Sequence, residues 1–217
     1  ALRACGVEPG DEVITVGNSD ISTSAAISQC GATPVFCDVL AADYTIDPAS
    51  VEPLVTERTA ALLPVDLHGH PADVRRLREI AEQYKLKIVE DAALATGAYD
   101  YGRPVGAFAD VTLFSFAPFK PLGCTGNGGM VVTGDEDLAR RIRLLCGYGH
   151  DPDQRDITPG HQRYVSEGYN VPLDPLQAAL VRVKLPHLDA WTERRRAIVA
   201  RYAAGLRDLD VQLPRFR

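Results

Sequence analysis

Short apolar runs rich in β-branched residues alternate with longer segments of helical periodicity, and this alternation constrains the fold more than any other feature. The predicted strands are 11–16, 34–39, 60–67, 87–91, 111–116 and 130–133, and the predicted helices lie near 21–30, 47–55, 72–84 and 135–146. Strands that alternate with crossover helices form parallel sheets, and strands that are apolar throughout are buried on both faces. The sequence therefore predicts an α/β fold with a mostly parallel sheet.

Composition and charge remove several classes of function. The chain has 217 residues, of which 46% are hydrophobic, and 23 Lys and Arg against 29 Asp and Glu give a net charge of −6. We expect no nucleic-acid partner, because no basic run with interleaved aromatic residues is present and the basic cluster 194–196 is interpreted as a solvated helix surface. We also expect no membrane span, because charges interrupt every apolar run before the roughly 18 residues that a span needs.

The five cysteines form no CxxC pair. An odd number of isolated thiols favours reduced cysteines in the cytoplasm over a disulfide framework or a zinc site.

The two ends of the chain are unlike a self-contained domain. Residues 1–6 resemble the last turn of an amphipathic helix closed by glycine, so the chain is interpreted as a piece of a longer protein.

A segment rich in Gly, Pro, Asp, His and Arg, 147–168, is predicted to be a long surface loop. Two more helices are predicted after it, over 175–184 and 189–209.

Polar residues at the ends of predicted strands are the candidates for chemistry, because ligands of parallel α/β sheets bind at the carboxyl ends of the strands. Asp91 ends one strand, Ser115 lies in the next, and Lys120 follows between two prolines. A lysine that is partly desolvated can form a Schiff base, and a facing carboxylate can hold a pyridinium proton, as in pyridoxal phosphate enzymes. Spacing alone leaves two alternatives open, a surface lysine at position 120 and a helix N-cap at position 91.

For two other motifs we favour a simpler interpretation over a phosphate-binding loop or a metal site. The glycine-rich stretch 123–129 leads into a strand and lacks the spacing of a phosphate-binding loop, so we predict a tight turn close to Lys120. His68 and His70 have a spacing that suits a metal, but no third ligand is evident. We therefore predict no metal site, and assign these histidines to loop packing or to a hydrogen bond with a substrate.

A series of motifs in a fixed order carries a resemblance to a known family. The motifs are Glu90-Asp91-Ala92-Ala93, Phe114-Ser115-Phe116-x-Pro-x-Lys120-x-Leu-Gly, Gly128-Gly129, Glu167-Gly168-Tyr169-Asn170 and Leu173-Asp174-Pro175-Leu176-Gln177-Ala178-Ala179. Together they closely resemble the DegT/DnrJ/EryC1/StrS aminotransferases, which depend on pyridoxal 5'-phosphate. The resemblance implies the three-layer α/β/α large domain of fold type I over residues 1–188. Residues 189–217 would be a linker helix and the start of a small C-terminal domain.

The resemblance also implies roles for particular residues. Lys120 would form the internal aldimine with the cofactor and later move the proton between substrate and cofactor. Asp91 would pair with the pyridine nitrogen, and Ser115 would bind the cofactor phosphate. Asn170 would reach the phosphate of the neighbouring subunit's cofactor, which implies a homodimer with shared active sites.

Two positions depart from the family pattern. Leu94 stands where members commonly have a glutamine that touches the 3'-oxygen of the cofactor. Asp20 stands where they usually have an aromatic residue that stacks on the pyridine ring. The resemblance further implies that the chain lacks the phosphate-binding Gly-Thr turn and most of the small C-terminal domain.

The resemblance implies transfer of an amino group from glutamate or glutamine to a keto group of a nucleotide-linked deoxysugar, in natural-product or surface-glycan biosynthesis. Three alternatives remain. The acceptor is a keto-cyclitol, the protein is a catalytically impaired structural or partner subunit, or it is another fold type I lyase or desulfurase.

Overall fold

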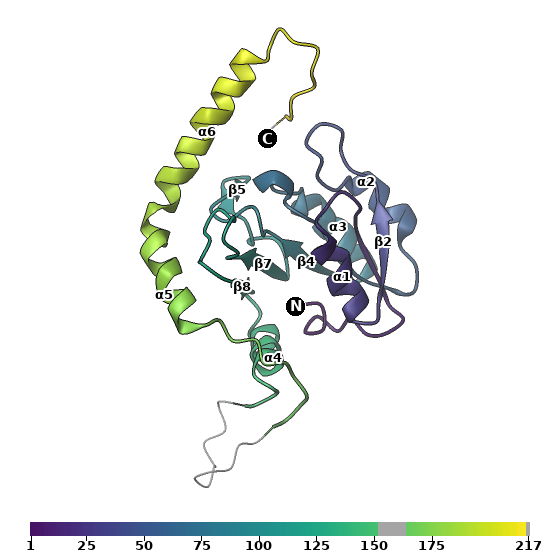
Figure 1. Ribbon diagram of the computed structural model, residues 1–217. Coiled ribbons are helices and arrows are strands. Elements are labelled where there is room, and N and C mark those ends of the chain that lie inside the picture. Colours follow the sequence, from purple (N-terminus) through teal and green to yellow (C-terminus); the bar gives the residue numbers. More distant parts are fainter. Residues whose placement is uncertain (152–163, 216–217) are drawn as a thin grey trace.

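The computed structural model describes residues 1–151 and 164–215, and its centre is a six-stranded sheet (Figure 1). The strands occur in the spatial order β2-β1-β3-β4-β7-β8. Their bounds are β1 Glu12–Val16, β2 Thr33–Cys37, β3 Thr59–Leu63, β4 Lys87–Asp91, β7 Val111–Ser115 and β8 Gly129–Val132. All neighbouring pairs are parallel except β7 and β8, which are antiparallel. The predicted α/β class with a mostly parallel sheet is confirmed.

The order of the strands determines where a ligand can bind. From β1 the chain passes through α1 (Ile21–Gln29) to β2 on one side. From β3 it passes through α3 (Val74–Tyr84) to β4 on the other side. Because crossovers between parallel strands are right-handed, α1 and α3 cover opposite faces of the sheet. The reversal between β1 and β3 opens a crevice at the carboxyl ends of the strands, where ligands of such sheets bind.

The core explains why these runs became strands. Val13, Ile14, Leu62, Ile88 and Val89 have no exposed surface, because helices cover both faces of the central strands. In α3 the buried residues follow the helical period, as the sequence predicted. Asp73 caps the first turn of this helix, and Lys85 in the left-handed conformation ends it.

Proline corrects two of the predicted element bounds. The helix predicted near 47–55 is only α2 (Pro48–Val51) followed by a 3₁₀ turn, η1 (Glu52–Leu54). Pro53 has no N–H for a helical hydrogen bond and its ring crowds the preceding turn. The strand predicted over 60–67 ends at Leu63 for the same reason, since Pro64 cannot donate to the sheet.

Two elements of two residues each were not predicted. They are β5 (Tyr99–Asp100) and β6 (Arg103–Pro104), which pair with each other outside the main sheet.

The last part of the chain lies along one side of the molecule. Figure 1 shows α5 (Pro175–Lys184) and α6 (Leu188–Gly205) as a nearly continuous rod that projects beyond the sheet, with the 3₁₀ turn η3 (Leu185–His187) between them. α4 (Glu136–Cys146) precedes the segment predicted as a long loop, most of which, 152–163, lies outside the described residues. The domain boundary predicted at residue 188 stays a prediction.

In the described part of the chain, every helix is too short or too polar to cross a membrane.

Candidate active site

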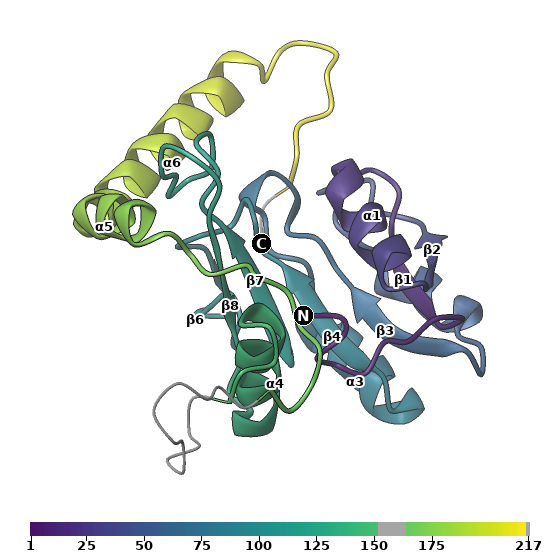
Figure 2. The same ribbon diagram turned by 60° about the horizontal axis from the view of Figure 1, so that its bottom comes forward.

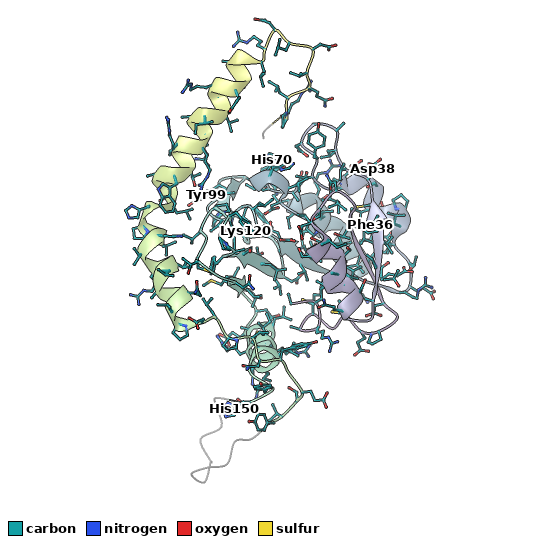
Figure 3. All side chains as sticks on the ribbon, viewed as in Figure 1. Phe36, Asp38, His70, Tyr99, Lys120 and His150 are labelled. Carbon is teal, nitrogen blue, oxygen red and sulfur yellow. The ribbon has the colours of Figure 1, made fainter. Side chains whose placement is uncertain are left out.

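A cavity of about 640 Å³ lies at the carboxyl ends of β3, β4 and β7 and brings several predicted site residues together. Asp20, Asp91, Ser115 and Lys120 all line it. One face of α1 along its length, the first three residues, the segment after β7, part of α4 and the segment around Tyr169 form its other walls. In Figure 3 Lys120 lies near the middle of the molecule, above the strands. A volume of several hundred Å³ suits a small organic cofactor and part of its substrate.

Asp91 is held rigidly at the base of this cavity. Its backbone N–H donates to the carbonyl of Pro64 at 2.9 Å, and its carbonyl accepts the N–H of Asp66 at 3.0 Å. Its Oδ1 accepts the N–H of Ala93 at 3.1 Å, and its Oδ2 accepts the Thr23 hydroxyl at 3.2 Å. No helix follows Asp91, so the alternative of a helix N-cap is wrong.

Lys120 lies in a tight turn that begins at Ser115. The Ser115 hydroxyl accepts the N–H of Ala117 at 3.3 Å, and the carbonyl of Ala117 accepts the N–H of Lys120 at 3.0 Å. The Lys120 side chain is half-buried and lines the cavity. Within residues 1–151 and 164–215, no hydrogen bond or ion pair occupies its amine, which leaves the nitrogen available to a ligand. The alternative of a simple surface lysine does not fit this placement.

The glycine-rich stretch closes the turn beneath Lys120, as the sequence predicted. A Cβ atom at Gly123 would lie 2.6 Å from the carbonyl oxygens of both Ala117 and Pro118, so only glycine fits. Residues 123–129 do not line the cavity, which agrees with a packing role for this stretch.

Helix α5 fastens the same stretch from the other side. Gln177 Oε1 accepts the backbone N–H groups of Thr125 at 3.0 Å and Gly126 at 3.1 Å. Lys184 Nζ donates to the carbonyl of Gly123 at 2.5 Å. The loop that carries Lys120 is therefore attached to a helix more than fifty residues further along the chain.

Asp20 caps the N-terminus of α1 at the edge of the cavity. Its Oδ1 accepts the N–H of Ser22 at 2.9 Å, and hydrogen bonds from Ser22 lower the pKa of the Asp20 carboxyl. The positive charge of Lys120 acts in the same direction, which agrees with their placement around one cavity. No aromatic residue occupies this position, and the aromatic side chains that line the cavity are Phe114, Phe119 and Tyr169.

Leu94 and Asn170 do not line the cavity. Leu94 is half-buried in the turn after β4, where its carbonyl oxygen approaches Gly69. Asn170 is exposed and pairs with Gly147 through the backbone, although its neighbours Tyr169 and Val171 both line the cavity. Their predicted roles toward the cofactor stay predictions.

The two histidines of the His-Gly-His motif differ in environment. His70 is buried with its Nε2 3.4 Å from Asp43 Oδ2, whereas His68 is exposed with a φ of 57°. Among the described residues, no group of three or more His, Cys, Asp or Glu side chains is arranged to hold a metal.

Sequence reasoning assigned no site role to three residues of the cavity wall, Thr23, Arg3 and Tyr169. Thr23 donates to Asp91, and Arg3 joins α1 to the segment after the long loop, because it donates to the carbonyl of Gln29 at 3.1 Å and lies 5.5 Å from the ring centre of Tyr169. A signal existed only for Thr23, which lies on the face of α1 that also carries buried Ile27. The partners of all three are distant in sequence.

Two buried carboxyls lie behind Asp91, on the other face of the sheet. Asp66 is fully buried, and Glu90, which precedes Asp91 on β4, accepts the Thr112 hydroxyl at 2.9 Å. Asp66 Oδ1 accepts the N–H of Ala72, and its Oδ2 has no hydrogen-bond partner within the described residues. Burial raises the pKa of Asp66 well above its ordinary value of 3.8, and the nearby Glu90 carboxylate adds to this effect.

The groups around the cavity fit pyridoxal phosphate. This cofactor needs an amine for its aldehyde, a carboxylate for its ring nitrogen and hydrogen-bond donors for its phosphate. Lys120, Asp91 and Ser115 supply groups of these three kinds at the ends of two adjacent strands. Asp91 still has free lone pairs, because a carboxylate accepts about four hydrogen bonds and two are used here.

Known proteins are similar to this chain over nearly its whole length. A dTDP-3-amino-3,4,6-trideoxy-alpha-D-glucose transaminase of Streptomyces venezuelae is 49% identical over 211 residues, which is 96% of this chain and 53% of that protein. The crystal structure of S. venezuelae DesV in complex with a ketimine intermediate matches with a TM-score of 0.90 and 46% identity, covering 99% of this chain and 56% of that one. The structure of NtdA from Bacillus subtilis with bound cofactor PMP matches with a TM-score of 0.88 and 33% identity, covering 96% of this chain and 46% of that one.

The chain therefore spans about half the length of the relatives it matches. Its fold is that of the fold type I aminotransferases, as the resemblance implied, and pyridoxal phosphate is the cofactor of the family. The sequence profile of the DegT/DnrJ/EryC1/StrS aminotransferase family matches residues 1–216, and the chain belongs to this family.

Proposed function

We propose that the protein transfers an amino group from glutamate or glutamine to the keto group of a nucleotide-linked deoxysugar. The observation that supports this most directly is the meeting of Lys120, Asp91 and Ser115 in one cavity of a chain that belongs to an aminotransferase family. The transaminase activity on a dTDP-linked amino sugar that a relative's name states supports a sugar as acceptor. The donor becomes a 2-oxo acid, and the ketone of the sugar becomes an amine.

When bound, pyridoxal phosphate supplies an aldehyde conjugated to a ring that accepts an electron pair from the substrate carbon. In this proposal Asp91 holds a proton on the ring nitrogen, because an ionised carboxylate beside that atom favours the protonated form. The Ser115 hydroxyl binds the phosphate. The Lys120 amine attaches the cofactor. It then carries a proton between the substrate and the cofactor on the open side of the cavity.

Covalent capture at Lys120 tests the chemistry without measuring turnover. The complete gene product is incubated with pyridoxal phosphate, reduced with borohydride, digested and analysed by mass spectrometry. We expect the added mass on the peptide that contains Lys120. Lys120→Arg keeps the positive charge but has no nucleophilic amine, so it should abolish the labelling and lower activity at least about 100-fold.

Lys85→Arg is the matched control, because Lys85 is exposed and lies at the end of α3. Labelling that persists in Lys120→Arg would refute the assignment. Cofactor capture without amine transfer to any keto sugar would instead support an impaired partner subunit, and transfer to a keto-cyclitol alone would change the acceptor.

We further propose that the protein is a homodimer whose active sites are shared. Asn170 is exposed and outside its own cavity, while Phe119 at the cavity wall is 88% exposed, as expected of residues that a second subunit covers. In this arrangement, Asn170 contacts the cofactor phosphate in the partner's site.

Subunit complementation tests this arrangement. Inactive Lys120→Ala and Asn170→Ala variants are mixed, unfolded and refolded together. Mixed dimers should regain activity, because one of their two sites receives an intact lysine from one chain and an intact asparagine from the other. If both residues serve the same subunit's site, every site keeps one defect and no activity returns.

The five cysteines are all free thiols, which supports a reducing compartment such as the cytoplasm as the place of action.

A further inference from the structure

Two hydroxyl groups at the N-terminal end of α1 form a chain of hydrogen bonds to the carboxylate of Asp91; Ser19 lies just before the helix and Thr23 in its first turn. Ser19 Oγ lies 2.8 Å from Thr23 Oγ1, and Thr23 Oγ1 lies 3.2 Å from Asp91 Oδ2. An ionised carboxylate only accepts hydrogen bonds, so the Thr23 hydroxyl is the donor to Asp91. Thr23 Oγ1 then accepts a hydrogen bond from the Ser19 hydroxyl, so both hydroxyl groups donate in the direction of Asp91.

Burial makes this contact consequential. Thr23 is only 4% exposed, and hydrogen bonds gain strength where the surroundings have a low dielectric constant. A hydrogen bond to the charged form of a carboxyl favours that form. The N-terminal end of a helix, where Thr23 lies, also favours a negative charge. Thr23 therefore gives the Asp91 carboxylate a buried hydrogen-bond donor.

The same contact restrains the orientation of the Asp91 side chain. Its Oδ1 accepts the N–H of Ala93 and its Oδ2 accepts the Thr23 hydroxyl, so each oxygen has its own donor. The backbone is fixed as well, through Pro64 and Asp66 after β3, and through the N–H of Ala92, which donates to the carbonyl of Leu113 on β7 at 2.9 Å. Without Thr23, rotation about the last side-chain bond is restrained at one oxygen only.

We propose that Thr23 is a positioning residue, which keeps the Asp91 carboxylate aimed at the ring nitrogen of the bound cofactor, with Ser19 supporting it. This inference rests on the proposed function. It concerns a residue that touches Asp91 and not the reacting atoms.

Two substitutions separate the hydroxyl from the shape of the side chain. Thr23→Val keeps the branched shape and removes the hydroxyl, and Thr23→Ser keeps the hydroxyl and removes a methyl group. The first readout is the dissociation constant of pyridoxamine phosphate, measured by equilibrium dialysis with the complete gene product. Thr23→Val should raise this constant about tenfold, since hydrogen bonds to charged groups are among the stronger ones. Thr23→Ser should stay close to the parent protein.

The second readout distinguishes a positioning role from a purely structural one. With cofactor labelled by ¹⁵N in the ring, the chemical shift of the ring nitrogen reports its protonation across pH. The nitrogen should lose its proton at a lower pH in Thr23→Val than in the parent and in Thr23→Ser. Thermal unfolding of the cofactor-free variants measures any general loss of stability. If Thr23→Val does not fold, Ser19→Ala should shift the ¹⁵N titration in the same direction by a smaller amount.

The outcomes are separable from the proposed function. An unchanged ¹⁵N titration in Thr23→Val, or a Thr23→Ser variant as defective as Thr23→Val, overturns the positioning role. If the parent protein itself binds no cofactor, the proposed function fails instead.

Discussion

Two consecutive carboxyl residues on β4 have opposite environments. Side chains alternate between the faces of a strand, so Asp91 faces the cavity and α1, while Glu90 faces the buried side with Asp66. Asp91 is surrounded by hydrogen-bond donors, whereas Asp66 keeps one oxygen without a donor in the described structure. Burial accordingly raises the pKa of Asp66, and also that of Glu90.

The raised pKa of Asp66 makes stability depend on pH. Above pH 3.8 the Asp66 carboxyl of the unfolded chain releases its proton, whereas that of the folded protein retains it. The free energy of unfolding therefore falls as the pH rises from the pKa of Asp66 in the unfolded chain to its pKa in the folded protein. Asp66→Asn keeps an oxygen for the Ala72 N–H and has no charge to bury. At pH 8 it should raise the free energy of unfolding by at least about 1 kcal/mol and flatten its pH dependence.

Urea unfolding of both proteins between pH 5 and pH 9 measures this effect. Glu79→Gln is a suitable control, because it removes one carboxylate from the exposed side of α3. Equal slopes with pH in the parent and in Asp66→Asn would contradict the prediction.

At the scale of elements, the lysine loop is positioned by packing around it. Residues 116–128 connect the antiparallel strands β7 and β8, and α5 fastens this connection through Gln177 and Lys184. A small cluster of buried residues, among them Phe116, Leu122 and Val181, fills the space between the loop and α5. The amine of Lys120 is therefore placed by a rigid loop.

Gly123→Ala tests this rigidity. The new methyl group would lie 2.6 Å from two carbonyl oxygens, so the turn beneath Lys120 must shift. We expect a loss of about 1–3 kcal/mol in stability and at least a tenfold loss of activity, because a misplaced amine no longer meets its target. Gly134→Ala is the control, since nothing lies within 4 Å of its Cβ position. Circular dichroism melts and amine-transfer rates check both, and similar behaviour of the two variants would contradict the role of Gly123.

The sequence predicted most of the elements and the ends of the strands that form the site. Buried strands such as β3 are nearly continuous apolar runs, and the position of Asp91 at the end of the predicted strand 87–91 was visible in the sequence. β5 and β6 were not predicted, because two exposed residues carry no hydrophobic period. The contact of Thr23 with Asp91 could not be predicted either, since it joins positions 68 residues apart and depends on how α1 packs.

The molecule as a whole is a six-stranded sheet covered by helices, with the long helix α6 at its side. Figure 2 shows α5 and α4 toward the left of the view and α1 toward the right, with the first residues between α4 and α1. α6 leaves this body and carries exposed apolar side chains, Ile198, Val199 and Tyr202. The chain that carries the cavity matches about half of the length of each relative.

Cofactor binding should stabilise the folded protein by mass action. At a pyridoxal phosphate concentration one hundred times its dissociation constant, the free energy of unfolding should increase by about 2.7 kcal/mol. Lys120→Ala should show a smaller increase at the same concentration, because covalent attachment no longer contributes. Differential scanning fluorimetry over a series of cofactor concentrations measures both, and a melting temperature independent of cofactor in the parent would contradict the prediction.

The antiparallel pairing of β7 with β8 has a consequence for the order of folding. The loop that carries Lys120 is bounded by a hairpin, so it can close through contacts that are local in the chain. The contact of α1 with Asp91 needs loop closure across 68 residues and the parallel pairing of β3 with β4. We therefore expect the lysine side of the site to form early in folding and the carboxylate side to form late. The cofactor would then bind to a nearly native chain, and its binding would complete the folding of the site.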